Sequence, residues 1–265
     1  MIGVFDSGIG GLTVVKALRE QLPDHDILYF GDTARTPYGN KSPATVIEYA
    51  LQNTRFLLDR GAHMVVMACN TASSVAPDAV AGRYDVALFE VITPAVATAL
   101  ESTRAGCVGV IGTRATVVSG VYEKQIAALR PEARVYSAAC PLLVPLVEEG
   151  WLQRPETAMI VKKYLHPLKV RQIDTLILGC THYPLLKSVI QRKIGKRVQI
   201  IDSSVSVAAE VKRFLEEKPD MDARLTKTGR IHIAVSDITP QFEKIARMTL
   251  KQDVQLEAVK IYKQS

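Results

Sequence analysis

Cysteine ends two of the apolar runs in this chain, and polar side chains able to do chemistry follow each of them. The run "VVMAC" ends at Cys69 and precedes Asn-Thr, while "LILGC" ends at Cys180 and precedes Thr-His. Such runs are typical of strands buried on both faces, and in open α/β sheets the residues just past a strand's carboxyl end line the crevice where ligands bind. A small buried cysteine that only packs is the alternative for either thiol taken alone.

A faint internal repeat relates the two cysteines. The segment "IGVFDSGIGGLTVV" from Ile2 is echoed by "VGVIGTRATVVSGV" from Val108, an offset of 106 residues, and Cys69 and Cys180 are offset by 111. Two strand ends thus recur at nearly one separation, and loops absorb the difference. We infer a duplicated α/β half that brings the two thiols face to face across one cleft.

Three kinds of chemistry could use these thiols. A metal site is poorly supported because Cys180 and His182 supply two ligands and the spacing offers no third or fourth. A hydrolase with a Cys180 nucleophile and His182 as its base leaves the duplicated Cys69 unexplained. An acid and a base on opposite faces of one carbon require a pair of thiols related by approximate two-fold symmetry. Only this third chemistry uses the repeat.

A glycine-rich turn lies near the start of the chain, in "FDSGIGGLTV". Asp6 and Ser7 follow the expected first strand, and three glycines allow a tight turn before a helix that begins near Leu12. Exposed backbone amides at such a helix start bind anions. The spacing is not GxGxxG and no acidic residue ends the next strand, which argues against a nucleotide. The alternative is a purely structural turn in which Asp6 satisfies backbone donors.

The elements that position these residues follow from alternating β-rich runs and helical patterns, which are typical of βαβ units and a parallel sheet. Between the second and third runs, apolar residues recur at helical spacing from Val46 to Leu58, and Gly61 provides a C-terminal cap. The predicted fold class is α/β, and without a low-complexity linker any domain boundary must be a tight crossing. The runs that predict strands are "MIGVF", "DILYF", "HMVVMA", "VALFEVI", "CVGVIG", "RVYSAA", "TLILG", "VQIID", "RIHIAV" and "QLEAVKI".

Composition narrows the class of protein further. The 265 residues are 48% hydrophobic, as in an ordinary globular protein, and no apolar run approaches the length that spans a bilayer. We expect a cytoplasmic protein with four free thiols and no membrane partner. The net charge of +6 raises the question of nucleic acid, but the densest basic stretch, 191–197, has no interleaved aromatics and suits a solvated helix end. No nucleic-acid partner is expected.

Six motifs, in order from residue 3 to residue 186, resemble those of glutamate racemases. They are "GVFDSGIGGLTV", "YFGDTARTPYG", "ACNTAS", "VIGTRAT", "CPLLVPLVEEG" and "GCTHYPLL". The later "TGRIHIAVSDITPQFEKIARMTL" is similar to that family's closing strand and helix, so the resemblance covers essentially the whole chain. The full "DSGIGG" is not expected of the related aspartate racemases.

The resemblance implies two pseudo-symmetric α/β domains, each a mainly parallel sheet flanked by helices, with the active site in the cleft between them. The first domain would comprise residues 1–94 and 205–265, and the second residues 95–204. The implied activity is the interconversion of L-glutamate and D-glutamate without any cofactor or metal, which supplies D-glutamate for peptidoglycan. A homodimer is also implied.

The same resemblance assigns the catalytic roles. Cys69 would remove the α-proton of D-glutamate with help from Asp6, and Cys180 that of L-glutamate with help from His182. Glu149 is expected near His182, with the adjacent Glu148 left open as the alternative. Cys107 and Cys140 are expected to be structural, although Cys140 opens a motif and could line the site. The positions that match contacts with the substrate's two carboxylates and amino group are Ser7, Pro37, Tyr38, Gly39, Asn70, Thr71, Thr113, Thr116 and Thr181.

Overall fold

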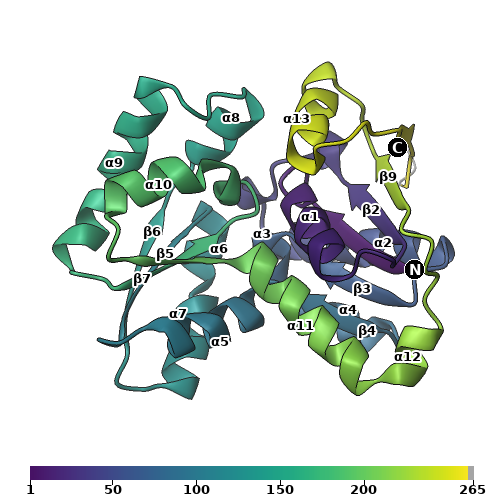
Figure 1. The fold of residues 1–265 in the computed structure, drawn as a ribbon, viewed down its shortest axis with the longest axis horizontal. Helices are drawn as coiled ribbons and strands as arrows, with labels where there is room; N and C mark the ends of the chain where they lie inside the picture. The colour runs from purple at the N-terminus through teal and green to yellow at the C-terminus, as the bar shows by residue number, and fades with distance from the viewer. Residues whose placement is uncertain (262–265) are drawn as a thin grey trace.

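The computed structural model describes residues 1–261 as two lobes, each built on its own sheet (Figure 1). Every strand pairing in these residues is parallel, as the alternating pattern predicts. The first sheet has the order β10-β9-β2-β1-β3-β4 and the second β6-β5-β7-β8. The strands are β1 (Ile2–Asp6), β2 (Ile27–Gly31), β3 (Met64–Met67), β4 (Ala87–Glu90), β5 (Cys107–Gly112), β6 (Arg134–Ala139), β7 (Thr175–Gly179), β8 (Gln199–Asp202), β9 (Ile231–Val235) and β10 (Leu256–Ala258).

The second sheet repeats four strands of the first in the same order. Strands β2-β1-β3-β4 correspond to β6-β5-β7-β8, so that β1 and β5 are equivalent, as are β3 and β7. These two pairs are the strands whose sequences show the 106- and 111-residue offsets. The fold is therefore the predicted pair of related α/β halves.

Helices cover both faces of each sheet, which explains why the strands are continuous apolar runs. The first sheet packs against α1, α11 and α13 on one face and against α2 and α4 on the other. The second packs against α8, α9 and α10 on one face and α5 and α7 on the other. The helices are α1 (Leu12–Gln21), η1 (Thr33–Arg35), η2 (Tyr38–Asn40), α2 (Pro43–Asp59), α3 (Asn70–Ser73), α4 (Pro77–Arg83), α5 (Ile92–Ser102), α6 (Arg114–Ser119), α7 (Val121–Leu129), α8 (Leu143–Glu148), α9 (Pro155–Val170), η3 (Tyr183–Leu186), α10 (Lys187–Ile194), α11 (Ser203–Glu217), α12 (Pro219–Ala223) and α13 (Pro240–Leu250).

Helix α2 illustrates how local sequence sets these elements. The Ser42 side chain accepts a hydrogen bond from the backbone of Thr45, and Pro43 occupies the first turn. Such a cap stabilises a helix by about 1 kcal/mol. The helix ends before Gly61, whose φ of +87° suits glycine. No helix within residues 1–261 is both long enough and apolar enough to cross a membrane.

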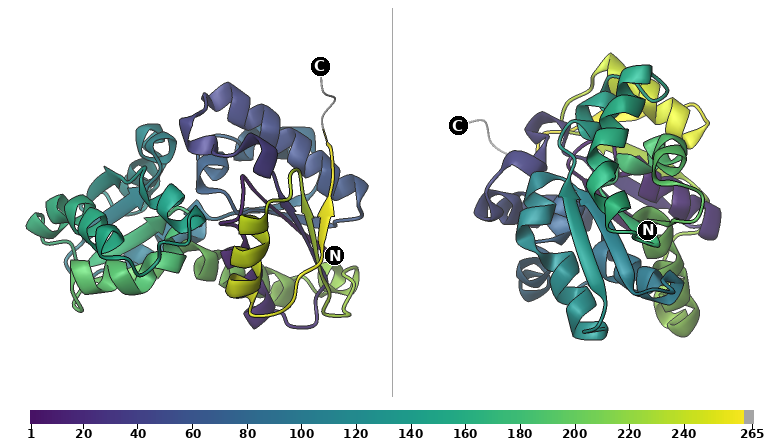
Figure 2. Two further views of the ribbon diagram at one scale, coloured as in Figure 1. Left: turned by 90° about the horizontal axis from the view of Figure 1, so that it is seen from above. Right: turned by 90° about the vertical axis from the view of Figure 1, so that its left-hand side faces the viewer.

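The chain crosses between the lobes twice. Strand β4 ends in the first sheet at Glu90, and α5 already packs on the second; β8 ends in the second sheet at Asp202, and α11 packs on α1. The boundaries expected near 94 and 204 fall in the first turns of these two helices, and their exact limits stay a prediction. Because α5 and α11 contact each other, the crossings lie together, and the lobes stand side by side about them (Figure 2).

Candidate active site

Cys69 and Cys180 lie just past the carboxyl ends of β3 and β7, the equivalent strands of the two lobes. Each is 5% exposed, and both line one enclosed cavity formed by residues of both lobes. The cavity has a volume of about 20 Å³. That is room for about one water molecule. The duplicated strand ends thus bring the two thiols to the same small space.

The structure brings most of the expected residues to this cavity. Asp6 and Thr116 lie next to residues that line the cavity but do not line it themselves, and Glu149 does not line it either. Two further residues line the cavity that the sequence did not predict, Thr36 and Val144. Thr36 directly precedes Pro37, an expected substrate contact, and Val144 lies inside the "CPLLVPLVEEG" motif. Cys140 is buried but is not part of the lining. The expected residues that line the cavity are Ser7, Pro37, Tyr38, Gly39, Cys69, Asn70, Thr71, Thr113, Cys180, Thr181 and His182.

His182 links Cys180 to a carboxylate. Its Nδ1 atom lies 3.9 Å from Cys180 Sγ, and its Nε2 atom lies 3.2 Å from Glu148 Oε1. Burial opposes a charge on His182, but the hydrogen bonds to Cys180 and Glu148 outweigh it and raise the pKa of the imidazole to about 10. His182 is therefore an imidazolium at neutral pH, and this positive charge lies beside the Cys180 sulfur.

The carboxylate beside His182 is Glu148, and the expectation of Glu149 is corrected on this point. Glu148 is the last residue of α8, and Glu149 follows it, so the two side chains leave the helix in directions about 100° apart. Glu148 faces His182, whereas Glu149 has no such contact, and both glutamates line a neighbouring cavity.

The surroundings of Cys69 are different. The Cys69 thiol donates to Ser7 Oγ at 3.7 Å, and Asp6 lies nearby with its Oδ1 accepting a hydrogen bond from Thr181 at 3.2 Å. Burial, and then the negative charge of Asp6, raise the pKa of Cys69 to about 12. Burial also raises the pKa of Asp6 itself. The site thus holds a protonated thiol on one side and a thiol paired with an imidazolium on the other.

A chain of hydroxyl groups crosses from one lobe to the other. Thr71 Oγ1 lies 3.0 Å from Thr113 Oγ1, which lies 3.0 Å from Thr116 Oγ1. Thr113 also caps α6 by accepting from the backbone of Thr116. These neutral groups can present O–H donors to an anion at the cavity wall.

Tyr38 contributes to the site differently from a free hydroxyl. Its OH donates to Asp32 and accepts from Asn53 Nδ2 at 3.0 Å, both in the same lobe. The phenol is therefore already satisfied, and the donors that this segment can offer are the backbone amides at the start of η2, which have no partner inside the helix.

Two glycines allow the lobes to approach closely at the site. A Cβ atom on Gly10 would lie 2.3 Å from Thr181 Oγ1 and 2.5 Å from His182 Nδ1, and one on Gly39 would lie 2.9 Å from the Cβ of Thr113. Any side chain at Gly10 would have to displace the residues that surround Cys180. The glycine-rich turn thus has a packing role across the lobes.

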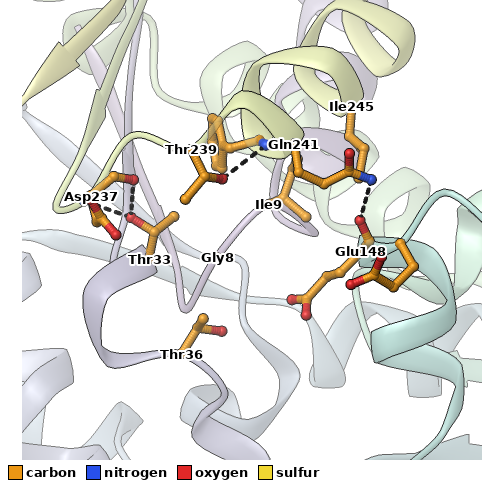
Figure 3. Close-up of a pocket in the computed structure, with 11 residues that line it drawn as sticks. Gly8, Ile9, Thr33, Thr36, Glu148, Asp237, Thr239, Gln241 and Ile245 are labelled. Atoms are coloured by element: carbon orange, nitrogen blue, oxygen red, sulfur yellow. Dashed lines mark hydrogen bonds between the residues drawn. The ribbon is translucent and has the colours of Figure 1, made fainter.

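A second cavity of about 190 Å³ opens beside the first, between the turn after β1, helix α13 and the end of α8 (Figure 3). Gln241 on α13 points across it, and its Nε2 donates to the backbone carbonyl of Glu148 at 2.5 Å. Glu149 also lines this cavity. The bond ties the last helix of the first lobe to the residue that holds His182.

Within residues 1–261, no group of three or more His, Cys, Asp and Glu side chains is placed to hold a metal ion. What the site offers instead is a pair of thiols with different electrostatic surroundings, neutral hydrogen-bond donors and little room for water. Two acid/base groups in one enclosed cavity are suited to moving a proton between the two faces of a small molecule.

Comparison with known proteins agrees with that class of chemistry. The profile of the Asp/Glu/Hydantoin racemase family matches residues 11–211, and the chain belongs to this family of amino-acid racemases.

Within that family, the chain is similar over nearly its whole length to several glutamate racemases. The chain is 45% identical over 262 residues to the glutamate racemase of Persephonella marina, covering 99% of this chain and 98% of that one. Its fold matches a crystal structure of a glutamate racemase isoform from Bacillus anthracis with a TM-score of 0.92 and 36% identity, covering 98% and 97% of the two chains. The glutamate racemase of Francisella tularensis, solved in complex with D-glutamate, matches with a TM-score of 0.90 and 39% identity over 98% and 97%.

Proposed function

We propose that this chain is a glutamate racemase that interconverts L-glutamate and D-glutamate without a cofactor, through acid/base chemistry of Cys69 and Cys180. The observation that carries the proposal is that two thiols at equivalent strand ends line one enclosed cavity. The glutamate racemases to which the chain is similar support glutamate as the substrate.

In the direction from L-glutamate, Cys180 takes the α-proton as a thiolate, and Cys69 gives its own proton to the opposite face. The bond from the α-carbon to hydrogen breaks on one side and re-forms on the other, and the two sulfurs exchange protonation states. The imidazolium of His182 supports the charge on Cys180, while the high pKa of Cys69, about 12, keeps its proton available. The reverse reaction begins with the opposite protonation of the pair.

The intermediate carries negative charge beside an ionised carboxylate, so the site must hold that charge without water. We assign this task to neutral donors, namely the Asn70 amide, the hydroxyls of Ser7, Thr71, Thr113 and Thr181, and the backbone amides of Tyr38 and Gly39. Fixed donors in a dry cavity stabilise charge that develops in the transition state. Because the cavity holds only about 20 Å³, we infer that the lobes separate to admit glutamate.

The first experiment asks whether the purified protein racemises glutamate. L-glutamate incubated with the protein and no added cofactor should lose its circular dichroism signal, and chiral chromatography should show D-glutamate. Aspartate should react far more slowly, since a chain shorter by one methylene leaves a carboxylate or its donors unpaired, at a cost of roughly 1–3 kcal/mol or more. Comparable turnover of both amino acids would count against the assignment.

The second experiment tests the two-thiol mechanism in deuterated water. Early D-glutamate made from L-glutamate should carry deuterium at the α-carbon, while recovered L-glutamate should not. Cys69→Ala and Cys180→Ala should each abolish racemisation, since either change removes one partner of the transfer. A single base serving both faces would instead label both enantiomers equally and would survive the loss of Cys69, whereas a cysteine hydrolase would need Cys180 alone.

We further propose a cytoplasmic homodimer that supplies D-glutamate for peptidoglycan, resting on the resemblance to glutamate racemases. Sedimentation at several protein concentrations tests the dimer, and a single monomeric species would exclude it. Growth of a D-glutamate auxotroph that carries this coding sequence, without added D-glutamate, tests whether the protein supplies D-glutamate for peptidoglycan.

A further inference from the structure

A buried tyrosine connects helix α7 of the second lobe to the cavity wall of the first. Tyr122 is 1% exposed, and its hydroxyl donates to Asn70 Oδ1 at 2.7 Å. Its ring also lies under Gly179, the residue before Cys180, since a Cβ atom there would lie 3.2 Å from the ring. Tyr122 therefore touches both halves of the site without lining the cavity.

The bond to Tyr122 occupies one end of the Asn70 amide. An amide has an acceptor oxygen and a donor nitrogen on opposite sides, so an oxygen held by Tyr122 leaves the nitrogen directed elsewhere. Asn70 Nδ2 is buried and has no hydrogen-bond partner within residues 1–261, while Asn70 lines the cavity. A buried unpaired donor is costly, and one at a ligand cavity indicates an acceptor that the ligand brings.

We propose that Tyr122 is a positioning residue that fixes the orientation of the Asn70 amide, so that Nδ2 donates to a carboxylate of the substrate. The inference rests on the proposed function. Without the tyrosine hydroxyl, the Asn70 amide is free to turn its oxygen toward the cavity. That oxygen is an acceptor, so it cannot form a hydrogen bond with a carboxylate of the substrate. The contact crosses the lobes, so the orientation is set only when the two halves are together.

Tyr122→Phe tests this, with Tyr183→Phe as the matched control. Both rings are fully buried in the second lobe, but the Tyr183 hydroxyl donates to the backbone carbonyl of Cys140 at 3.0 Å, which has no second orientation. We expect Tyr122→Phe to raise the KM for both glutamate enantiomers about tenfold, the scale of one hydrogen bond to a charged group. Tyr183→Phe should change the KM less than about twofold, because no donor to the substrate is reoriented.

A double-variant cycle separates positioning from general packing. In the Asn70→Ala background there is no amide to orient, so adding Tyr122→Phe should raise the KM less than about twofold further. Asn70→Asp should bind glutamate more weakly than Asn70→Ala, since its second oxygen faces the carboxylate as an anion. The inference would be overturned if Tyr122→Phe raised the KM by the same factor in the wild-type and the Asn70→Ala backgrounds. It would also be overturned if the Tyr122→Phe enzyme were active and its KM equalled that of the Tyr183→Phe enzyme. Absence of racemisation in the wild-type protein would instead refute the proposed function.

Discussion

Nε2 of His182 lies 3.2 Å from Oε1 of Glu148, while Nδ1 of the same ring faces the Cys180 sulfur at 3.9 Å. The imidazole therefore lies between a carboxylate and a thiol, and each ring nitrogen has one partner. Such an arrangement fixes the ring orientation and retains the proton that makes it an imidazolium. The side of the site that holds Cys180 depends on a residue at the very end of α8.

This geometry predicts different effects for two adjacent glutamates. Glu148→Gln should lower kcat/KM from L-glutamate by about tenfold or more, because it weakens the charge on His182. Glu149→Gln, the matched control one residue later, should change it less than about twofold. Initial rates in both directions check the pair. A larger loss in the Glu149 variant would reverse the assignment made from the hydrogen bond.

His182 should titrate far above the ordinary range of an imidazole. Its pKa is raised from 6.5 to about 10. The charged ring therefore stabilises the folded protein fully below pH 6.5, and this contribution is lost as the pH rises through about 10. NMR of the imidazole nitrogens, assigned with His182→Asn, measures the titration directly. Glu148→Gln should lower the midpoint, and a wild-type midpoint near 6.5 would contradict the ion pairing.

Asp6→Asn should act mainly on the side that holds Cys69. The charge of Asp6 is the second cause, after burial, of the raised pKa of Cys69, so removing it should lower that pKa toward the ordinary range. Alkylation of Cys69 in a Cys180→Ala background, followed against pH by mass spectrometry, reads this shift. Because Asp6 is proposed to assist Cys69, we also expect a larger loss of kcat from D-glutamate than from L-glutamate, while kcat/KM falls equally in both directions because the two enantiomers are equally stable. Unchanged kinetics in both directions would remove Asp6 from the mechanism.

Gly10→Ala should inactivate the enzyme while leaving most of the fold intact. A methyl group there would lie 2.3 Å from Thr181 Oγ1 and must push the lobes apart at the site. Misplacement on the ångström scale costs about 100-fold in rate. Gly82→Ala is the control, since a Cβ there meets nothing within 4 Å. Thermal unfolding should show a folded protein in both cases, and an active Gly10→Ala variant would show that the close approach is not required.

The architecture was predictable because a parallel strand that is buried on both faces of its sheet has a continuous apolar sequence. Each of the ten runs coincides with a strand to within one residue at its carboxyl end or contains it, and the two sequence offsets pair β1 with β5 and β3 with β7. The cysteines followed from the same pattern, since each directly follows such a run. The pattern of apolar residues was sufficient to predict the strands and the two cysteines because each of these features is confined to a short segment of the sequence.

The remaining parts of the site depend on orientation and on contacts between distant residues. Sequence could not separate Glu148 from Glu149, because the choice depends on the rotation of α8 against η3. It could not show that the Tyr38 hydroxyl is already bonded to Asp32 and Asn53. Tyr122 carried no local signal at all, since its partner Asn70 lies in the other lobe, 52 positions away.

The recurrence of β2-β1-β3-β4 as β6-β5-β7-β8 places one thiol from each lobe at the shared cavity, so that under the proposed mechanism each lobe carries out half of the reaction. One lobe acting alone could remove a proton and return it only to the same face, which exchanges hydrogen with solvent but preserves handedness. Inversion of the α-carbon therefore requires both lobes, held together at the shared cavity. A change that weakens the contact between the lobes without altering either thiol is expected to uncouple isotope exchange from the change of chirality.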